Sequence, residues 1–142
     1  MSKTNNKFNL DLPADWNDHT VHCFMGPDDS GHQHMLTVVV DPDVRGLELI
    51  EFARDRIAAA ANPMQSIEVL KDEEKTLANG LPAWEYVYKW VPADGKVVYQ
   101  KNIYMIIGER GYTFMASFTK KTMKTIALEV EKMICSLEPL TE

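Results

Sequence analysis

The nine residues 83–91, AWEYVYKWV, carry an aromatic side chain at every second position: Trp84, Tyr86, Tyr88 and Trp90. A period of two is typical of a β-strand, because successive side chains of a strand point to opposite faces of the sheet. The stretch therefore predicts a strand with one aromatic face and one mixed face. We expect the aromatic face to be core beneath a helix. The alternative, that the aromatic face itself binds a partner, remains open from the sequence.

The residues around this strand predict an antiparallel meander. Asn79-Gly80 precedes the strand, and Asn-Gly is the strongest short signal for a two-residue hairpin turn. Glycine-containing turns follow at 93–95 and 109–111. Four consecutive strands are therefore expected, at 66–78, 81–91, 97–108 and 112–118. The charged sequence LKDEEKTLA at 70–78 leaves a helix open as an alternative for the first of them.

The rest of the chain predicts three more strands and two helices. The strands are expected at 8–12, 20–25 and 35–41, and the helices, each with an apolar stripe, at 46–61 and 122–137. This order is typical of the α+β class, with an antiparallel sheet of about seven strands and two main helices. Such a sheet is about 30 Å wide, so two helices would cover roughly two-thirds of one face. We expect the other face to be wet, covered by loops or used for binding.

Composition argues against several classes of function. The 142 residues carry a net charge of −6 and the pI is near 5.2, which argues against binding to nucleic acid or to anionic membranes. No apolar run approaches the length of a membrane span, and the first residues lack the apolar segment of a signal peptide. The two cysteines, Cys23 and Cys135, are too few for a disulfide framework. We expect a cytoplasmic protein with a flexible N-terminus at 1–7 and a single domain at 8–139.

The sequence contains no familiar catalytic motif. GxGxxG, the P-loop, GxSxG and HExxH are all missing, so we expect no enzymatic activity, no catalytic residue and no cofactor. His32 and His34, next to Asp28 and Asp29, have the residue types of a metal site. A solvated loop is the alternative that we favour for this segment, so no metal is expected.

A longer pattern extends over nearly the whole chain. It consists of Trp16 within LPADW, the alternating TVHCF at 20–24, the entry GLPAWEYVY at 80–88, and the hairpin and closing helix that follow. From about residue 8 to residue 139, this order resembles the DcrB-like family of the Mog1/PsbP-like fold. Within that family, size and layout resemble the Eag chaperones of bacterial type VI secretion. The resemblance implies a Mog1/PsbP-like sandwich that works as a cytoplasmic homodimer.

The resemblance also implies a partner and a binding surface. Eag chaperones bind the N-terminal hydrophobic helices of effectors that carry PAAR and often Rhs domains, and shield them before the effector is loaded on the VgrG spike. The helices lie across the sheet. By position, the resemblance places this surface at Val21, Cys23, Thr37 and Val39. Cys23 and Thr37 are smaller or more polar than the bulky aliphatic residues of the family, which bears on which effector is accepted.

The residue pattern adds Val87 to this set. Val87 lies between Glu85 and Lys89 on the face of 83–91 opposite the aromatic row, and an aliphatic centre with a charged rim suits a peptide groove. We therefore expect Val87 on the open side of the sheet. Other interpretations of the same pattern are a sheet covered on both faces, a regulatory module like the small-GTPase partners that share the fold, and a carrier of a small hydrophobic ligand.

Overall fold

The computed structural model describes residues 11, 13–16, 21–29, 31–60, 66–91 and 95–138. Its elements are, in chain order, β1 (Val21–Asp29), β2 (His32–Asp41), α1 (Leu49–Ala60), β3 (Ile67–Thr76), β4 (Pro82–Trp90), β5 (Val98–Ile107), β6 (Arg110–Phe118), the 3-10 helix η1 (Thr122–Lys124) and α2 (Ile126–Cys135). The strand expected at 8–12 lies outside the described residues, except for residue 11.

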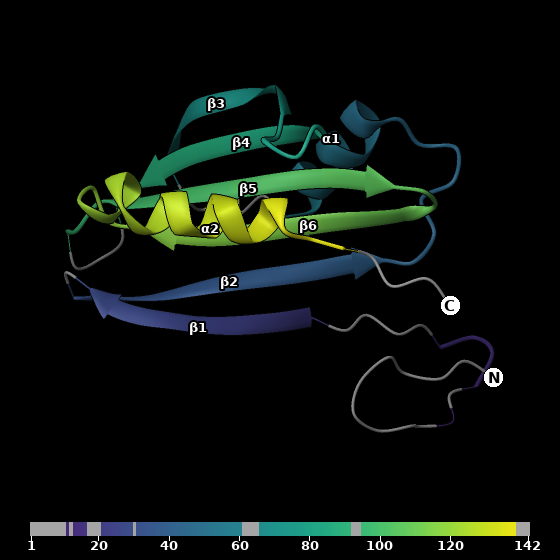
Figure 1. Ribbon diagram of the computed structural model, residues 1–142, viewed down its shortest axis with the longest axis horizontal. Coiled ribbons are helices and arrows are strands. Elements are labelled where there is room, and N and C mark those ends of the chain that lie inside the picture. The colour runs from purple at the N-terminus through teal and green to yellow at the C-terminus, as the bar shows by residue number, and fades with distance from the viewer. Residues whose placement is uncertain are drawn as a thin grey trace.

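The strands form one antiparallel sheet in the order β1-β2-β6-β5-β4-β3 (Figure 1). Strands β3 to β6 are the meander that the turn signals predict. The helical alternative for 70–78 is wrong, because β3 pairs with β4 along most of its length. The α+β class is confirmed, but the described residues form a sheet of six strands rather than about seven.

The two helices lie on opposite faces of the sheet (Figure 1). Helix α1 contacts β4 and β5, whereas α2 contacts β6 from the other side. The expectation that both helices cover one face is therefore wrong. The reason is that the central strands carry apolar side chains on both faces, so each face needs its own cover. One buried cluster joins α1 to β4 and β5 and comprises Val44, Phe52, Ala53, Trp84, Tyr86 and Tyr104.

The aromatic row of β4 is core at its first two positions, as expected. Trp84 and Tyr86 are each 9% exposed, and both belong to the cluster that contains Phe52 of α1. The Trp84 indole Nε1 donates a hydrogen bond of 2.7 Å to Asp72 Oδ1 on β3. Towards the end of the strand, Trp90 is only half-buried. Helix α1 thus covers only part of the aromatic row.

Polar contacts fix the position of α1 along the sheet. Arg56 donates two hydrogen bonds to Asp41 at the end of β2, from Nε to Oδ2 at 3.0 Å and from Nη2 to Oδ1 at 2.8 Å. Arg54 pairs with Asp72 of β3 at 2.5 Å, and its guanidinium lies 5.2 Å from the centre of the Trp84 ring. Because bidentate arginine–carboxylate pairs have a defined geometry, these contacts orient the helix as well as attach it.

Candidate functional site

Strands β1 and β2 present an open surface on the same side of the sheet as α1. Three direct cross-strand pairs build it, namely Val21–Val39, Cys23–Thr37 and Met25–Met35, and Met115 of β6 lies opposite Thr37. Direct cross-strand partners share a face of the sheet, so these side chains all lie on one side. We call this surface the open floor, and it comprises Val21, Cys23, Met25, Met35, Thr37, Val39 and Met115.

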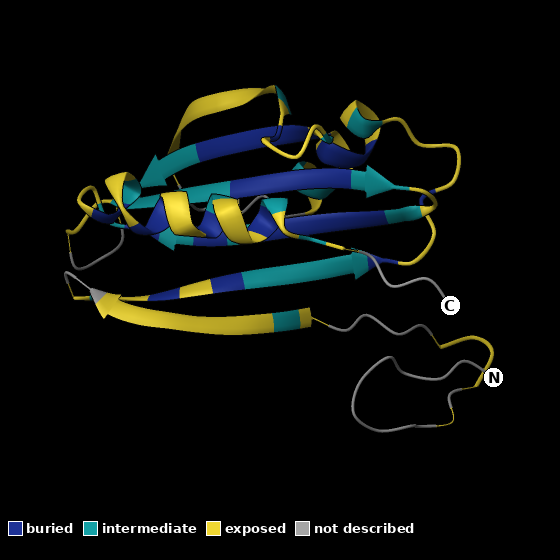
Figure 2. Cartoon of the chain, in the orientation of Figure 1, coloured by how far each residue is buried: buried dark blue, intermediate teal, exposed yellow. Residues whose placement is uncertain are grey.

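The open floor is mostly apolar, with its β1 residues and Met35 exposed to solvent and Thr37, Val39 and Met115 half-buried. Val21 is 51% exposed, Met25 65% and Met35 40%. Cys23 is exposed too, and its Sγ lies 3.9 Å from Thr37 Oγ1. Figure 2 shows that β1 is exposed along most of its length. An antiparallel sheet that faces water normally carries polar side chains on that face, so a contiguous apolar patch here indicates a surface for a partner.

The structure brings together four of the five expected site residues. Val21, Cys23, Thr37 and Val39 are neighbours in the floor, and their role in binding stays a prediction. The sequence pattern could also have assigned Met25 and Met35 to this surface, because they continue the same two-residue alternation along β1 and β2. Met115 joins the floor only through the pairing of β2 with β6, which local sequence does not predict.

Val87 lies on the other face. The register links Val87 to Lys101 and then to Ala116, and Ala116 belongs to the core cluster around α2. Val87 is 4% exposed. Thr37, by contrast, is linked through Met115 and Asn102 to the aromatic row, so the open floor and the aromatic row share a face. The expectation of Val87 on the open side is therefore wrong, because Val87 lies on the face that α2 covers.

Glu85, expected at the rim of the groove, is instead buried in a cluster of charges. Its carboxylate lies 3.3 Å from Lys71 Nζ, 3.3 Å from Lys75 Nζ and 3.2 Å from Lys101 Nζ. Glu131 of α2 pairs with Lys75 and Lys101. Burial acts to raise the pKa of Glu85, but the nearby lysine charges outweigh it, and the pKa is lowered. These charges connect α2 to β3, β4 and β5.

A row of polar side chains on β5 borders the open floor. Gln100 Nε2 donates to Asn102 Oδ1 at 3.0 Å, and Asn102 Nδ2 donates to Tyr104 Oη at 3.0 Å. Asn102 and Tyr104 are buried, whereas Gln100 is half-buried. Burial raises the pKa of Tyr104 to about 12, so its phenol stays protonated at neutral pH. The row ends in the half-buried Gln100 amide.

His32 and His34 make structural contacts. Their rings meet edge to face with centroids 4.8 Å apart. His34 is buried, with Nδ1 3.0 Å from the Pro27 carbonyl and Nε2 2.8 Å from Thr122 Oγ1, and His32 Nε2 lies 2.9 Å from Ser117 Oγ. These hydrogen bonds attach the β1–β2 hairpin to η1 and β6. Within the described ranges, no three His, Cys, Asp or Glu side chains are grouped as a metal site.

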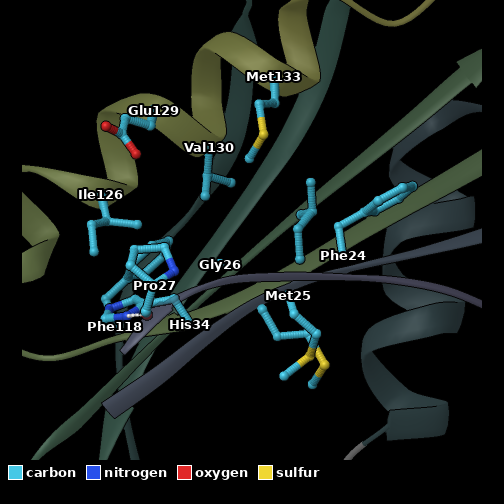
Figure 3. A pocket seen from close by; sticks show the side chains of 12 residues that line it. Phe24, Met25, Gly26, Pro27, His34, Phe118, Ile126, Glu129, Val130 and Met133 are labelled. Carbon is cyan, nitrogen blue, oxygen red and sulfur yellow. Dashed lines mark hydrogen bonds between the residues drawn. The ribbon is translucent and has the colours of Figure 1, made fainter. Parts of the chain in front are cut away.

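A second apolar feature lies on the α2 side, between that helix and β1. It is a cavity of about 180 Å³. Phe24 of β1 and Met133 of α2 line it from opposite sides, and His34, Pro27 and Phe118 lie together at one end (Figure 3). Ligand pockets for small molecules usually measure about 300–1,000 Å³, so this cavity suits only a short apolar group. The sequence indicated apolar residues on both faces of this strand, but not that α2 lies beside it.

The model of the DcrB family matches residues 8–136. The chain belongs to the DcrB family. Among solved structures, this DcrB-family protein is similar to PA94 from Pseudomonas aeruginosa, a protein of unknown function described as a candidate regulator. The TM-score is 0.74 at 12% identity, covering 100% of this chain and 99% of PA94. This similarity shows a shared fold.

A weaker similarity links the DcrB-family chain to LpqN, a protein involved in cell envelope biogenesis of Mycobacterium tuberculosis. Its TM-score is 0.48 at 13% identity, and it covers 86% of this chain and 83% of LpqN. No curated protein sequence matches the chain. Among the helices that the structure describes, none is long and apolar enough to span a membrane.

Proposed function

We propose that this DcrB-family protein is a non-enzymatic binding protein whose open floor holds an apolar helix of a partner protein. The observation that carries the proposal is the contiguous surface of β1, β2 and β6, in which Val21, Cys23, Met25 and Met35 are exposed and Thr37, Val39 and Met115 are half-buried. Burying a leucine-sized side chain contributes about 1.5–3 kcal/mol, so a few contacts are enough for binding. Three of the seven floor residues are methionines, whose flexible side chains adapt to differently shaped partners.

The dimensions of the floor fit one helix. Three strands spaced by about 4.8 Å give a surface about 10 Å between the outer strands, which matches the diameter of a helix with its side chains. The polar row on β5 borders this surface, and the half-buried Gln100 amide can bond to polar groups of the bound segment. An apolar centre with a polar border is the usual arrangement of a protein interface.

The partner that we propose is an N-terminal hydrophobic helix of a type VI secretion effector with PAAR and Rhs domains. The support is the resemblance of the sequence to Eag chaperones, together with the apolar floor at the residues which that resemblance implies. A membrane-type helix exposed to water aggregates or inserts into the wrong membrane. A chaperone that covers the helix until the effector is loaded on the VgrG spike prevents both outcomes.

Co-purification tests the proposal. The probe is a soluble carrier protein fused to an apolar helix of about 20 residues, co-expressed with the tagged chain. We expect the wild-type chain to retain the fusion, and the carrier alone to be lost. Val21→Glu and Val39→Glu should stay folded and lose the fusion, because an unpaired carboxylate buried against an apolar helix is costly.

The matched control places the same charge outside the floor. Leu128 on α2 is 58% exposed, so Leu128→Glu should fold and retain the fusion. Lys101→Glu is unsuitable as a control, because the Lys101 side chain is only 12% exposed and contacts Glu85. Retention of the fusion by both floor variants would show that the floor is not the binding surface.

The cavity beside α2 favours a second candidate function, the carriage of a small apolar ligand. Its lining is mostly apolar and includes Phe24, Val130 and Met133. Titration with a short-chain fatty acid tests this function. Binding that disappears in Val130→Trp, which fills the cavity, would support it. Binding that survives in that variant would place the ligand elsewhere.

A further inference from the structure

A β-bulge in β1 lies at the cavity beside α2. Between two regular pairs of the β1–β2 ladder, Gly26 and Pro27 of β1 together oppose the single residue His34 of β2. All three residues line the cavity, and Gly26 contributes no side chain that would fill it. Bulges are common next to functional sites, because they bend the strand and redirect its side chains. The bulge thus gives a structural reason for the space between β1 and α2.

The cavity has a buried base and a mouth that opens to solvent. Buried side chains form the base, among them Phe118 of β6 and Val130 of α2. The rim carries the exposed side chains of Phe24, Glu129 and Met133. An apolar cavity of about 150 Å³ is large enough to bind benzene, so the volume of about 180 Å³ holds about six heavy atoms of a ligand. A ligand with a short apolar chain can therefore fill the base and leave its end group at the mouth.

One charged side chain at the mouth is available to a ligand. Both ring nitrogens of His34 are engaged, Nδ1 with the Pro27 carbonyl at 3.0 Å and Nε2 with Thr122 Oγ1 at 2.8 Å. Glu129 is the one carboxylate among the described residues that line the cavity, and no lysine or arginine is among them. Within the part of the chain that the structure describes, Glu129 forms no hydrogen bond or ion pair. Figure 3 shows its carboxylate on α2, above Ile126 in the view.

We propose that the cavity binds a primary alkylamine of about six carbon atoms, with its chain in the base and its ammonium group at Glu129. This inference rests on the carriage of a small ligand proposed above and names the class of that ligand. Alkylamines are protonated at neutral pH, as the lysine side chain is with its pKa of about 10.4. An ammonium group donates charge-assisted hydrogen bonds to a carboxylate, whereas the carboxylate of a fatty acid would meet a like charge.

A comparison of three ligands tests the class. Hexylamine, hexanol and hexanoate share one chain and differ in the charge of the end group. Dissociation constants follow from the NMR shifts of the methyl groups of Ile126, Val130 and Met133 during titration. An exposed ion pair changes an affinity by up to about fivefold, so hexylamine should bind about fivefold more tightly than hexanol, and hexanoate about fivefold more weakly. Salt at about 1 M should reduce both differences, because it screens exposed charges.

Variants at the mouth test the role of Glu129. Glu129→Gln removes the charge and keeps the shape, so it should bind hexylamine and hexanol equally, with hexanol at its wild-type affinity. The matched control, Glu74→Gln, removes the same charge from an exposed site on β3, at the opposite end of the strand order from β1, and should keep the wild-type preference. Met133→Trp narrows the mouth and should weaken all three ligands. Circular dichroism confirms folding of each variant. A preference for hexylamine that survives in Glu129→Gln would overturn the proposal.

The ligand class and the carriage of a ligand fail in different ways. If hexanol or hexanoate binds at the cavity as tightly as hexylamine, the amine class is wrong and the carriage of a small ligand stands. If none of the three ligands shifts the cavity methyl groups, or if Met133→Trp leaves all three affinities unchanged, the carriage of a ligand in this cavity is wrong as well. Neither result changes the test of the open floor, which lies on the other face of the sheet.

Discussion

The ring of Phe52 lies directly against Gly111: a Cβ atom at Gly111 would be 2.6 Å from Phe52 Cζ. Gly111→Ala should therefore force α1 away from β6 and lower the free energy of unfolding by about 1–3 kcal/mol. Gly26→Ala is the control, because a Cβ there meets its nearest atom at 3.5 Å. Urea unfolding measures both. A Gly111→Ala variant as stable as Gly26→Ala would contradict this prediction, because it would show that α1 can shift without lowering the free energy of unfolding.

The two tryptophans of β4 should contribute unequally to stability. Trp84 is buried and donates a hydrogen bond to Asp72, whereas Trp90 is half-buried. We expect Trp84→Ala to cost about 3–5 kcal/mol, and Trp90→Ala clearly less. Thermal and urea unfolding give the comparison. If Trp84→Ala keeps its stability but loses the helix fusion, the aromatic row belongs to the binding surface.

Stability should fall in acid partly because of Glu85. Its pKa is lowered in the folded protein, so the unfolded chain takes up this proton first as the pH falls. The charged carboxylate stabilises the folded protein at pH values above the ordinary glutamate pKa of about 4.3. This stabilisation is lost as the pH falls through the lower pKa that Glu85 has in the folded protein. Glu85→Gln should lower the free energy of unfolding by about 3 kcal/mol at pH 7, because it leaves the neighbouring lysines without their buried partner. Its stability should then depend less on pH between 5 and 3, and an unchanged slope would contradict this role.

Thr113 offers a stabilising substitution. Its Oγ1 is buried and has no hydrogen-bond partner among the described residues. Removing a buried, unpaired hydroxyl while keeping the shape relieves a desolvation cost, so Thr113→Val should stabilise the protein by about 1 kcal/mol. Urea unfolding measures the change, with Thr122→Val as the control. Thr122 Oγ1 bonds to His34, so that variant should destabilise.

The same substitution on the two faces should have opposite outcomes. Val87→Glu places a carboxylate at a site that is 4% exposed and should unfold the protein. Val21→Glu changes a side chain that is 51% exposed and should leave the melting temperature nearly unchanged. Circular dichroism melts of both variants test this. If Val87→Glu folds as well as Val21→Glu does, the Val87 site is more open to water than its exposure of 4% indicates.

The sequence predicted the meander because its information is local. Asn79-Gly80 specifies a hairpin turn, and the two-residue period of 83–91 specifies a strand. The family resemblance, and not the alternation, implied which side of β1 and β2 binds, but the alternation around Val21 and Val39 likewise indicates two strands. Each of these features depends on neighbours within a few positions, so short stretches of sequence were enough.

The assignment of faces failed because it depends on contacts between distant segments. Val87 was expected on an open side, but only the pairing through Lys101 to Ala116 shows that its face is the one that α2 covers. Glu85 resembled a solvated rim residue, because its lysine partners on β3 and β5 lie 10 to 16 positions away. Helix periodicity shows which stripe is apolar, but not which face of the sheet the stripe meets.

The strand order divides the sheet into two parts that are each continuous in the chain. The β1–β2 hairpin joins the β3–β6 meander through one ladder, in which Leu36 pairs with Ala116 and Asp41 with Gly111. Closing that ladder brings together residues about 70 to 80 positions apart, a contact that forms late because of its loop-closure entropy. We therefore expect amide protons of the hairpin to exchange with solvent sooner than those of β5. The segment that carries the open floor would then be the part of the molecule that detaches most readily and docks last during folding.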